Sequence, residues 1–379
     1  MSARHRRRPV AARYGLRAMP PVQDSIQQSA AGGASVKGHD LRVRRVIEET
    51  PDASSIVFEI PAALESVFRY EAGQFVTLRI TYAGTQLARC YSLSSSPDCN
   101  EEHKVTVKRV ADGRVSNWIN DSLREGNVVH VMPPGGLFTL KGGDRDLVFF
   151  AGGSGITPVI SLIKSALATT SRTIRLIYAN RDIASVIFRA ELEALAARHP
   201  RRFTIQYHLD VDGGFLDRAG AAAHVCGHED AEFYLCGPAP FMDTVELALR
   251  RMGVPASRTH IERFVSRPDH DAGTSEPASV NTSGDRDARS SVSVYLDGRT
   301  HDVPCERGET VLSAVQRAGL EPPLSCTDGF CGCCMAKLRA GNVRMKRNDF
   351  LSEKETSEGW VLTCQSVPLT SECSVEYPD

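Results

Sequence analysis

Four cysteines near the C-terminus have a spacing that suits an iron–sulfur site. Cys326, Cys331 and Cys334 lie within nine residues, and Cys364 follows after 29 intervening residues. Four thiolates can hold two irons bridged by two sulfides, with two protein ligands for each iron. Because three ligands lie on one segment, that segment must curl around the metals. The spacing therefore predicts a [2Fe-2S] cluster, which exchanges single electrons.

Two glycines and one extra cysteine also bear on this site. Gly329 and Gly332 lie between the ligands and would let the backbone bend and turn N–H donors toward the sulfurs. Zinc is the alternative metal, but zinc ribbons usually carry two paired C-x2-C knuckles, which this sequence lacks. Cys333 adjoins a ligand, and we expect it to point away from the cluster. Its exchange for a neighbouring ligand is the alternative.

The segment around these cysteines closely resembles the plant-type ferredoxin domain. The resemblance rests on the run from Cys326 to Cys334 and on Gly359-Trp-Val-Leu-Thr-Cys364-Gln-Ser-Val-Pro. It covers about residues 291–379 and implies an α+β, β-grasp-like domain that holds the cluster.

A second site is indicated by Arg89-Cys-Tyr91-Ser92, which resembles the R-x-Y-S motif of the ferredoxin-NADP reductase superfamily. The resemblance implies a bound flavin. Arg89 can then neutralise a flavin phosphate, and Tyr91 can pack on the isoalloxazine ring. The Ser92 hydroxyl can hydrogen-bond the flavin edge near N5, where hydride arrives.

The flavin interpretation is strengthened by a segment that looks like the superfamily's phosphate loop. Val107 ends an expected strand and Lys108 follows it. Gly113, Val115 and Ser116 come next, in a G-x-x-S pattern that opens a helix. We expect Ser116 to be the N-cap, with free N–H groups of the first turn facing a pyrophosphate. A pyrophosphate loop favours FAD over FMN.

A third site is indicated by a glycine-rich turn. Gly153, Gly155, Thr157 and Pro158 follow an apolar strand and open a helix. Pro158 replaces the third glycine of the dinucleotide pattern G-x-G-x-x-G, yet glycines still admit a pyrophosphate to the backbone and proline suits a first helical turn. The turn therefore predicts a nicotinamide-nucleotide site.

The partner of this turn is Cys236-Gly237-Pro238, at the end of another expected parallel strand, where such sheets bind ligands. Within the superfamily this pattern lies beside the nicotinamide, with the cysteine near the transferring carbon. Hydride transfer requires alignment of two rings and no covalent step. We therefore expect Cys236 to position the nicotinamide.

Two further segments complete the predicted nicotinamide site. His260-Ile-Glu262-x-Phe264 resembles the end of this domain in the superfamily, which would bring Glu262 near the hydride path and Phe264 near the flavin; a solvated charge is the alternative for Glu262. Asn180, Arg181 and Asp182 fall where adenosine-ribose contacts are made. Asp182 would bind ribose hydroxyls and favour NADH, whereas Arg181 would bind a 2′-phosphate and favour NADPH. We expect NADH.

The periodicity of the chain supplies elements that could hold these sites. Short alternating strands precede residue 140, apolar strands then alternate with helices, and a Ser-, Pro- and Asp-rich stretch precedes the cysteine region. The predicted fold is an antiparallel β-barrel for the flavin, an α/β parallel-sheet domain for the nicotinamide and an α+β ferredoxin domain. The expected limits are 1–37 for a disordered basic tail, 38–142 for the FAD-binding barrel, 143–265 for the NAD(P)-binding domain, 266–290 for a linker and 291–379 for the ferredoxin domain.

Individual elements can also be predicted. The expected strands are 41–43, 55–58, 75–78, 104–107, 128–131, 147–150, 174–178, 203–207 and 233–235, with a strand pair around Asp297-Gly298. One helix is expected to begin near Ser116. Three more are expected over 158–167, 188–197 and 309–318, with Gly319 as the C-terminal cap of the last.

Composition excludes several classes of protein. The 379 residues carry a net charge of −1, which gives no sign of nucleic-acid binding, and the longest uncharged stretch, 147–163, is short and glycine-rich for a membrane span. Eleven cysteines, an odd number, argue against a disulfide framework, and no secretory apolar region follows Met1. We expect a cytoplasmic protein. The arginine-rich tail leaves a transit peptide, a twin-Arg signal or a true start at Met19 as alternatives.

Taken together, residues 38–379 resemble the three-domain reductase components of multicomponent oxygenases. Within that family they are most like the reductases of 3-ketosteroid 9α-hydroxylases. The resemblance implies that electrons pass from NADH (or NADPH) through FAD and a [2Fe-2S] cluster to an oxygenase component or its ferredoxin, with a Rieske-type oxygenase expected. The alternatives are a di-iron oxygenase such as phenylacetyl-CoA oxygenase, a small acceptor such as a quinone or ferric chelate, or a non-catalytic redox carrier.

Overall fold

The computed structural model describes residues 38–264 and 290–378, apart from 325, 326, 328, 330, 349 and 352. The predicted tail and nearly all of the predicted linker lie outside these residues, as does Cys326. No helix among the described residues is long and apolar enough to cross a membrane.

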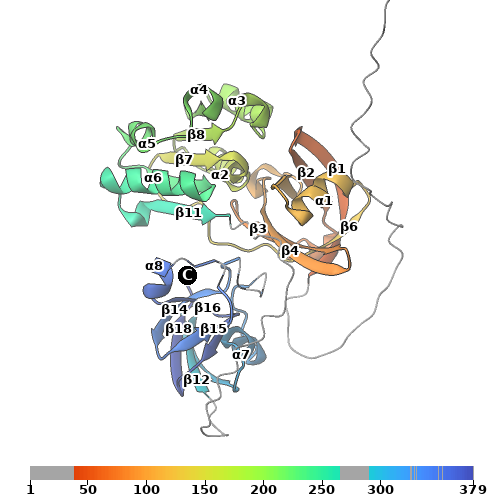
Figure 1. The fold of residues 1–379 in the computed structure, drawn as a ribbon, viewed down its shortest axis with the longest axis vertical. Coiled ribbons are helices and arrows are strands. Elements are labelled where there is room, and N and C mark those ends of the chain that lie inside the picture. The colour runs from red at the N-terminus through yellow and green to blue at the C-terminus, as the bar shows by residue number, and fades with distance from the viewer. Residues whose placement is uncertain are drawn as a thin grey trace, which may run out of the picture. The chain divides into compact units, whose positions relative to one another are not determined.

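The N-terminal domain is an antiparallel sheet of six strands in the order β4-β3-β6-β1-β2-β5 (Figure 1). Its outer strands approach each other where Leu93, just after β4, bridges to Val105 of β5, so the sheet curls into a barrel. Val76, Leu78 and Ile80 alternate along β3 and face the barrel core, as expected from the two-residue period of a strand. The bounds are β1 His39–Thr50, β2 Ala53–Glu59, β3 Phe75–Tyr82, β4 Thr85–Ser92, β5 Lys104–Lys108, β6 Val128–Val131 and α1 Arg114–Ser122.

The second domain is built on a parallel sheet with helices on both faces (Figure 1). Side chains of β7 alternate between two cores: Phe149 packs with residues of α2 and α3, whereas Val148 and Phe150 pack with residues of α5 and α6. The strand order is β11-β10-β7-β8-β9, so the chain adds β8 and β9 on one side of β7 and then β10 and β11 on the other. Open α/β sheets bind ligands at the point between β7 and β10 where the order changes side. The bounds are β7 Leu147–Gly152, α2 Ile156–Thr169, β8 Ile174–Asn180, α3 Arg189–Arg198, β9 Phe203–Leu209, α4 Asp210–Gly213, α5 Arg218–Val225, β10 Glu232–Gly237, α6 Ala239–Arg251 and β11 Thr259–Arg263.

The C-terminal domain has a five-stranded sheet in the order β13-β12-β18-β14-β16 and a separate pair, β15-β17. The hairpin between β12 and β13 turns at Asp297 and Gly298, whose φ angles are 50° and 73°. The core joins these strands to Val311, Ala314 and Val315 of α7. The bounds are β12 Ser290–Leu296, β13 Arg299–Cys305, α7 Val311–Arg317, β14 Met335–Ala340, β15 Val343–Met345, α8 Glu353–Ser357, β16 Trp360–Leu362, β17 Ser366–Pro368 and β18 Glu372–Glu376.

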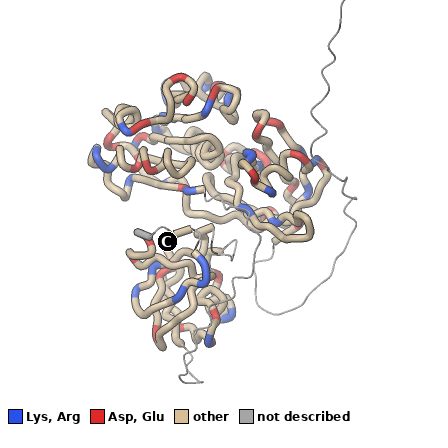
Figure 2. Tube along the Cα trace, viewed as in Figure 1, with Lys and Arg blue, Asp and Glu red and all other residues tan. Residues whose placement is uncertain are grey.

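Within the part of the chain that the structure describes, five short 3-10 helices connect these elements. They are η1 Ala62–Leu64, η2 Pro97–Cys99, η3 Gly153–Gly155, η4 Ile183–Ser185 and η5 Ala256–Arg258. Acidic and basic positions are interspersed along the described chain (Figure 2).

Two predicted helix starts differ from the structure. The expectation that Ser116 is an N-cap was wrong, because α1 begins at Arg114 and Gly113 is its N-cap. The helix expected from residue 309 begins at Val311, because the Thr310 side chain caps it by accepting a hydrogen bond from the Ser313 N–H at 3.3 Å. In addition, β4 was absent from the predicted strands, since Thr85–Ser92 shows little apolar alternation.

Candidate functional site

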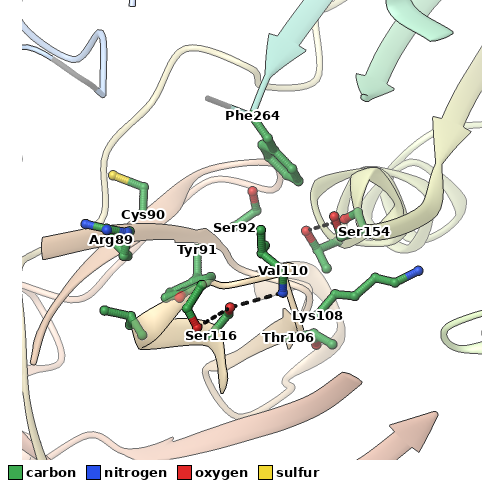
Figure 3. Close-up of a pocket in the computed structure, with 13 residues that line it drawn as sticks. Arg89, Cys90, Tyr91, Ser92, Thr106, Lys108, Val110, Ser116, Ser154 and Phe264 are labelled. Carbon is green, nitrogen blue, oxygen red and sulfur yellow. Dashed lines mark hydrogen bonds between the residues drawn. The ribbon is translucent and has the colours of Figure 1, made fainter. Parts of the chain in front are cut away.

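A pocket between the barrel and the first turns of the second domain receives most of the predicted flavin residues (Figure 3). Arg89, Tyr91 and Ser92 reach it from the end of β4. The full lining is Arg89, Cys90, Tyr91, Ser92, Thr106, Lys108, Val110, Gly113, Val115, Ser116, Ser154, Thr157 and Phe264. A barrel strand, a helix start and a glycine-rich turn therefore converge on one space.

The start of α1 forms one wall of this pocket. No side chain caps the helix at Gly113. Ser116 lies in the first turn instead, where its hydroxyl accepts a hydrogen bond from the Val110 N–H at 3.1 Å. A Cβ on Gly113 would lie 2.6 Å from the Ser116 Oγ. The positive end of the helix dipole and an uncapped first turn suit a phosphate, so this wall fits the pyrophosphate of FAD.

Residues of the second domain complete the pocket. Thr157 lies in the first turn of α2, and its hydroxyl donates to the Ser154 carbonyl at 3.0 Å. The Phe264 ring points into the pocket from the end of β11 (Figure 3). Lys108 lines this pocket and also the neighbouring cavity. The flavin pocket is thus bounded by both domains and adjoins a second space.

The second cavity lies at the carboxyl ends of the parallel strands. Gly153, Asn180, Arg181 and Pro238 are the predicted nicotinamide-site residues among its lining. The full lining is Lys108, Gly152, Gly153, Ala179, Asn180, Arg181, Asp210, Phe215, Leu216, Pro238, Pro240, Phe241 and Thr244.

Asn180 marks this cavity as a polar binding site. It is 4% exposed, and apart from a contact with the Tyr178 hydroxyl its amide has no hydrogen-bond partner among the described residues. A buried polar group without a partner is costly. A nucleotide in this cavity would offer such a partner, so the cavity fits the nicotinamide coenzyme.

Several predicted site residues line neither cavity. Gly155 approaches the end of β10 so closely that a Cβ would lie 2.1 Å from the Cys236 carbonyl oxygen. Cys236 is itself fully buried, and burial raises the pKa of its thiol well above the ordinary value, so the thiol is neutral and unsuited to nucleophilic attack. The predicted residues outside both linings are Val107, Gly155, Pro158, Asp182, Cys236, Gly237 and Glu262.

The predicted ribose residue Asp182 has a local structural task. Its carboxylate accepts a hydrogen bond from the Ser185 N–H at 2.9 Å, which caps η4, and it pairs with Arg181 at 2.8 Å. The carboxylate that lines the cavity belongs to Asp210, at the start of α4 directly after β9. Sequence analysis missed Asp210 and Phe215. The available signal for Asp210 was its position directly after the parallel strand β9, whereas Phe215, beyond α4, has no such signal.

Glu262 lies on β11 directly beside Cys236 on β10. It is half-buried, and loss of hydration raises the pKa of its carboxyl to about 8. The side chain is therefore largely protonated at neutral pH.

Two pairs of thiols lie close together among the described cysteines of the third domain. Cys334 and Cys364 hydrogen-bond through their thiols, and Cys331 does so with Cys333. The Gln365 amide donates to the Cys364 sulfur at 3.6 Å. No group of three potential metal ligands surrounds one point among the described residues. A [2Fe-2S] cluster needs only two thiolates for each iron, so the Cys334–Cys364 pair fits one of them.

Comparison with known proteins identifies all three domains. Residues 40–140 match the family described as "Oxidoreductase FAD-binding domain", residues 149–246 match "Oxidoreductase NAD-binding domain", and residues 294–369 match "2Fe-2S iron-sulfur cluster binding domain". The chain is 42% identical over 338 residues to the 3-ketosteroid-9-alpha-monooxygenase ferredoxin reductase component of Rhodococcus rhodochrous, covering 89% of this chain and 96% of that protein. The chain belongs to the family of oxygenase reductase components.

Further relatives agree with this assignment. The glycine betaine monooxygenase reductase subunit of Pseudomonas aeruginosa is 32% identical over 343 residues, covering 87% of this chain and 93% of that protein. The solved structure of phthalate dioxygenase reductase superimposes with a TM-score of 0.55 at 25% identity, over 90% of this chain and 98% of that one. The predicted three-domain fold and the predicted FAD, nicotinamide and [2Fe-2S] classes of cofactor are confirmed.

Proposed function

We propose that this protein is the reductase component of a multicomponent oxygenase, and that it uses NADH to reduce a Rieske-type partner. The observation that carries the proposal is the continuity of the first two sites: Lys108 lines both the flavin pocket and the nucleotide cavity. Full-length similarity to reductase components supports the same function. When bound, FAD accepts a hydride and releases electrons singly to the [2Fe-2S] cluster.

The residues of the flavin pocket would bind and orient FAD. Arg89 and the first turn of α1 would hold the phosphates, and Tyr91 would pack on the isoalloxazine ring. Ser92 would hydrogen-bond the ring near N5. Phe264 would cover the pocket and exclude water until the nicotinamide enters.

The residues around the second cavity would hold the coenzyme and select it. The Asp210 carboxylate would repel a 2′-phosphate and accept hydrogen bonds from free ribose hydroxyls, which favours NADH. Arg181 pairs with Asp182, so its charge is partly offset. Cys236 and the protonated Glu262 would form the wall behind the nicotinamide and position its reacting carbon.

Location and domain limits follow from the same proposal. We infer a cytoplasmic site of action, because the ten described cysteines form no disulfide and a thiolate-held cluster is compatible with a reducing compartment. The limits 38–142, 143–265 and 291–379 remain our assignment for the three domains. Residues 291–379 carry 13 acidic against 9 basic residues, which suits weak, salt-sensitive docking on an oxygenase.

Reconstitution with defined oxygenases tests the function. The purified holoprotein, with FAD and cluster contents measured, is mixed with NADH and either a Rieske-type steroid oxygenase or the catalytic components of a phenylacetyl-CoA epoxidase. We expect hydroxylated product in proportion to NADH consumed with the Rieske enzyme. Coupled turnover only with the epoxidase components would reassign the partner. Rapid NADH oxidation by quinones or ferric chelates without coupling to either oxygenase would contradict the proposal.

A further inference from the structure

A buried lysine lies where the barrel meets the nicotinamide-binding domain. Lys164 belongs to α2, and its side chain is 3% exposed. Its ammonium lies 2.6 Å from Glu101 Oε2, 3.0 Å from Glu191 Oε1 and 3.0 Å from the Ser94 carbonyl oxygen. An ammonium has three N–H donors, so three acceptors satisfy it fully. A buried cation of this kind is stable only with its partners in place.

The partners of Lys164 come from both domains. Ser94 and Glu101 belong to the barrel, in the segment between β4 and β5, whereas Glu191 belongs to α3. Lys104 of β5 also reaches Glu191, at 3.5 Å. Two cations and two carboxylates therefore form one charge-balanced network across the interface.

Two serines extend this contact along one face of α2. Ser161 and Ser165 lie three residues before and one residue after Lys164, which places all three on one stripe of the helix. The Ser161 hydroxyl donates to the Ser95 carbonyl at 2.5 Å, and the Ser165 and Ser96 hydroxyls lie 2.8 Å apart. Otherwise α2 is strongly apolar and buried between Ile156 and Leu167. The polar stripe thus specifies one register of the barrel segment against α2.

The two segments that make this contact, the barrel segment after β4 and helix α2, both continue into the nucleotide sites. Ser92, which lines the flavin pocket, lies two residues before Ser94. Gly153, just before the start of α2, lines the nucleotide cavity. Thr157, in the first turn of α2, lines the flavin pocket. A shift of α2 against the barrel segment would therefore change the spacing between the two sites.

We propose that Lys164 is a positioning residue for hydride transfer: its contacts with Ser94, Glu101 and Glu191 set the distance between the nicotinamide and flavin sites. The inference rests on the proposed NADH-to-FAD reaction. Reacting atoms must approach to about 3–3.5 Å, and misplacement by about 1 Å can cost on the order of 100-fold in rate. A well-packed apolar side chain would serve stability as well as a buried ion pair, whereas a fixed ionic contact selects a single geometry.

The test compares Lys164→Met with two further variants. Lys164→Met keeps much of the side-chain volume but removes the charge. Because Glu101 then loses its cation and Glu191 keeps only Lys104, a triple variant, Lys164→Met/Glu101→Gln/Glu191→Gln, removes those two carboxylate charges as well. Lys104→Met is the matched control, because the Lys104 ammonium reaches the same Glu191, whereas only the backbone carbonyl of Lys104, which the substitution keeps, bonds with Ser94. The readouts are anaerobic flavin reduction by NADH and by 4-deuterated NADH, the NADH dissociation constant, bound FAD and Tm.

Positioning and structural roles give different results. For positioning, we expect Lys164→Met and the triple variant to lose about tenfold or more in hydride-transfer rate per bound FAD, with NADH affinity within about twofold and a larger deuterium isotope effect. Lys104→Met should stay within about threefold of wild type. A triple variant that folds, binds FAD and transfers hydride at the wild-type rate would overturn the inference, whether or not Lys164→Met itself folds. Failure of the wild-type protein to oxidise NADH would instead refute the proposed function.

Discussion

The two nucleotide sites differ in how their recognisable sequence patterns are used. In the flavin pocket, the pattern residues themselves line the space, as Arg89, Tyr91 and Ser92 show. At the nucleotide cavity, Gly155 and Cys236 pack against each other behind the wall. Much of the lining there comes from residues without a pattern, such as Asp210 and Phe215. A sequence pattern can thus mark direct contacts at one site and the backbone geometry beneath the contacts at another.

The largest effect should come from loss of the [2Fe-2S] cluster, which would leave the two nucleotide sites intact but block electron transfer beyond the flavin. Cys334→Ser removes one thiolate of the Cys334–Cys364 pair, so we expect reduction of cytochrome c by NADH to fall by about 100-fold or more while most ferricyanide reduction remains. Steady-state assays with the two acceptors measure this. Cys333→Ser is the matched variant and should retain both activities. Equal loss of both activities in Cys334→Ser would argue against a serial path.

Arg89→Ala tests whether the flavin pattern residues make direct contacts. Loss of a charge-assisted hydrogen bond of about 1.5–3 kcal/mol should weaken FAD binding by about 10- to 150-fold. Titration of the apoprotein with FAD, followed by flavin fluorescence, gives the dissociation constant. Arg42→Ala, on the exposed surface of β1, should bind FAD as wild type does. An unchanged FAD affinity in Arg89→Ala would contradict the view that the pattern residues of the flavin pocket contact the ligand directly.

Gly155→Ala tests whether the pattern residues of the nicotinamide site act by setting the backbone geometry beneath the cavity. Its Cβ would meet the Cys236 carbonyl oxygen at 2.1 Å, so the backbones of β10 and α2 must separate. We expect a loss of about 1–3 kcal/mol in the free energy of unfolding, with a higher KM for NADH and little change in FAD affinity. Denaturant unfolding and NADH kinetics measure the two effects. Gly142→Ala, whose Cβ would have no neighbour within 4 Å, is the control.

Asp210→Asn tests whether Asp210, in the wall of the nucleotide cavity, selects NADH over NADPH. Removing the carboxylate should raise the ratio of kcat/KM for NADPH to that for NADH by about tenfold, because a 2′-phosphate is then no longer repelled. Asp182→Asn preserves a capping side chain at η4 and should leave the ratio near the wild-type value. A larger change in Asp182→Asn than in Asp210→Asn would restore the sequence-based assignment of the ribose contact.

The smallest effect concerns acid stability at the domain interface. Burial tends to raise the pKa of the Glu191 carboxyl, but the nearby charges of Lys164 and Lys104 outweigh it and hold this pKa below its ordinary value of 4.5. Its stabilisation is therefore complete above pH 4.5 and is lost as the pH falls through the lower folded-state pKa. Glu191→Gln should reduce the acid dependence of Tm, and because it also removes a charged partner of the buried Lys164, it should lower Tm at every pH. Glu193→Gln, half-exposed on the same helix, should keep the wild-type profile.

The sequence by itself determined the order of domains, the class of each fold and the chemistry of the cofactors. These features are carried by short-range patterns: alternating apolar residues, a strand followed by a glycine-rich turn, and cysteines at fixed spacing. Even there, the start of α1 was displaced, because the backbone around Gly113 rather than the Ser116 hydroxyl sets the helix end.

Only the tertiary structure decided which side chains face each site. Asp182, the predicted ribose ligand, caps its own turn, whereas Asp210, which follows β9 at the start of α4, lines the cavity. Likewise, Lys164 looks like an isolated charge in an apolar helix until Glu101 and Glu191 are brought to it from distant positions. The physical reason is that local spacing fixes backbone geometry and residue chemistry, while contacts between segments 27 to 70 residues apart depend on packing of the whole chain.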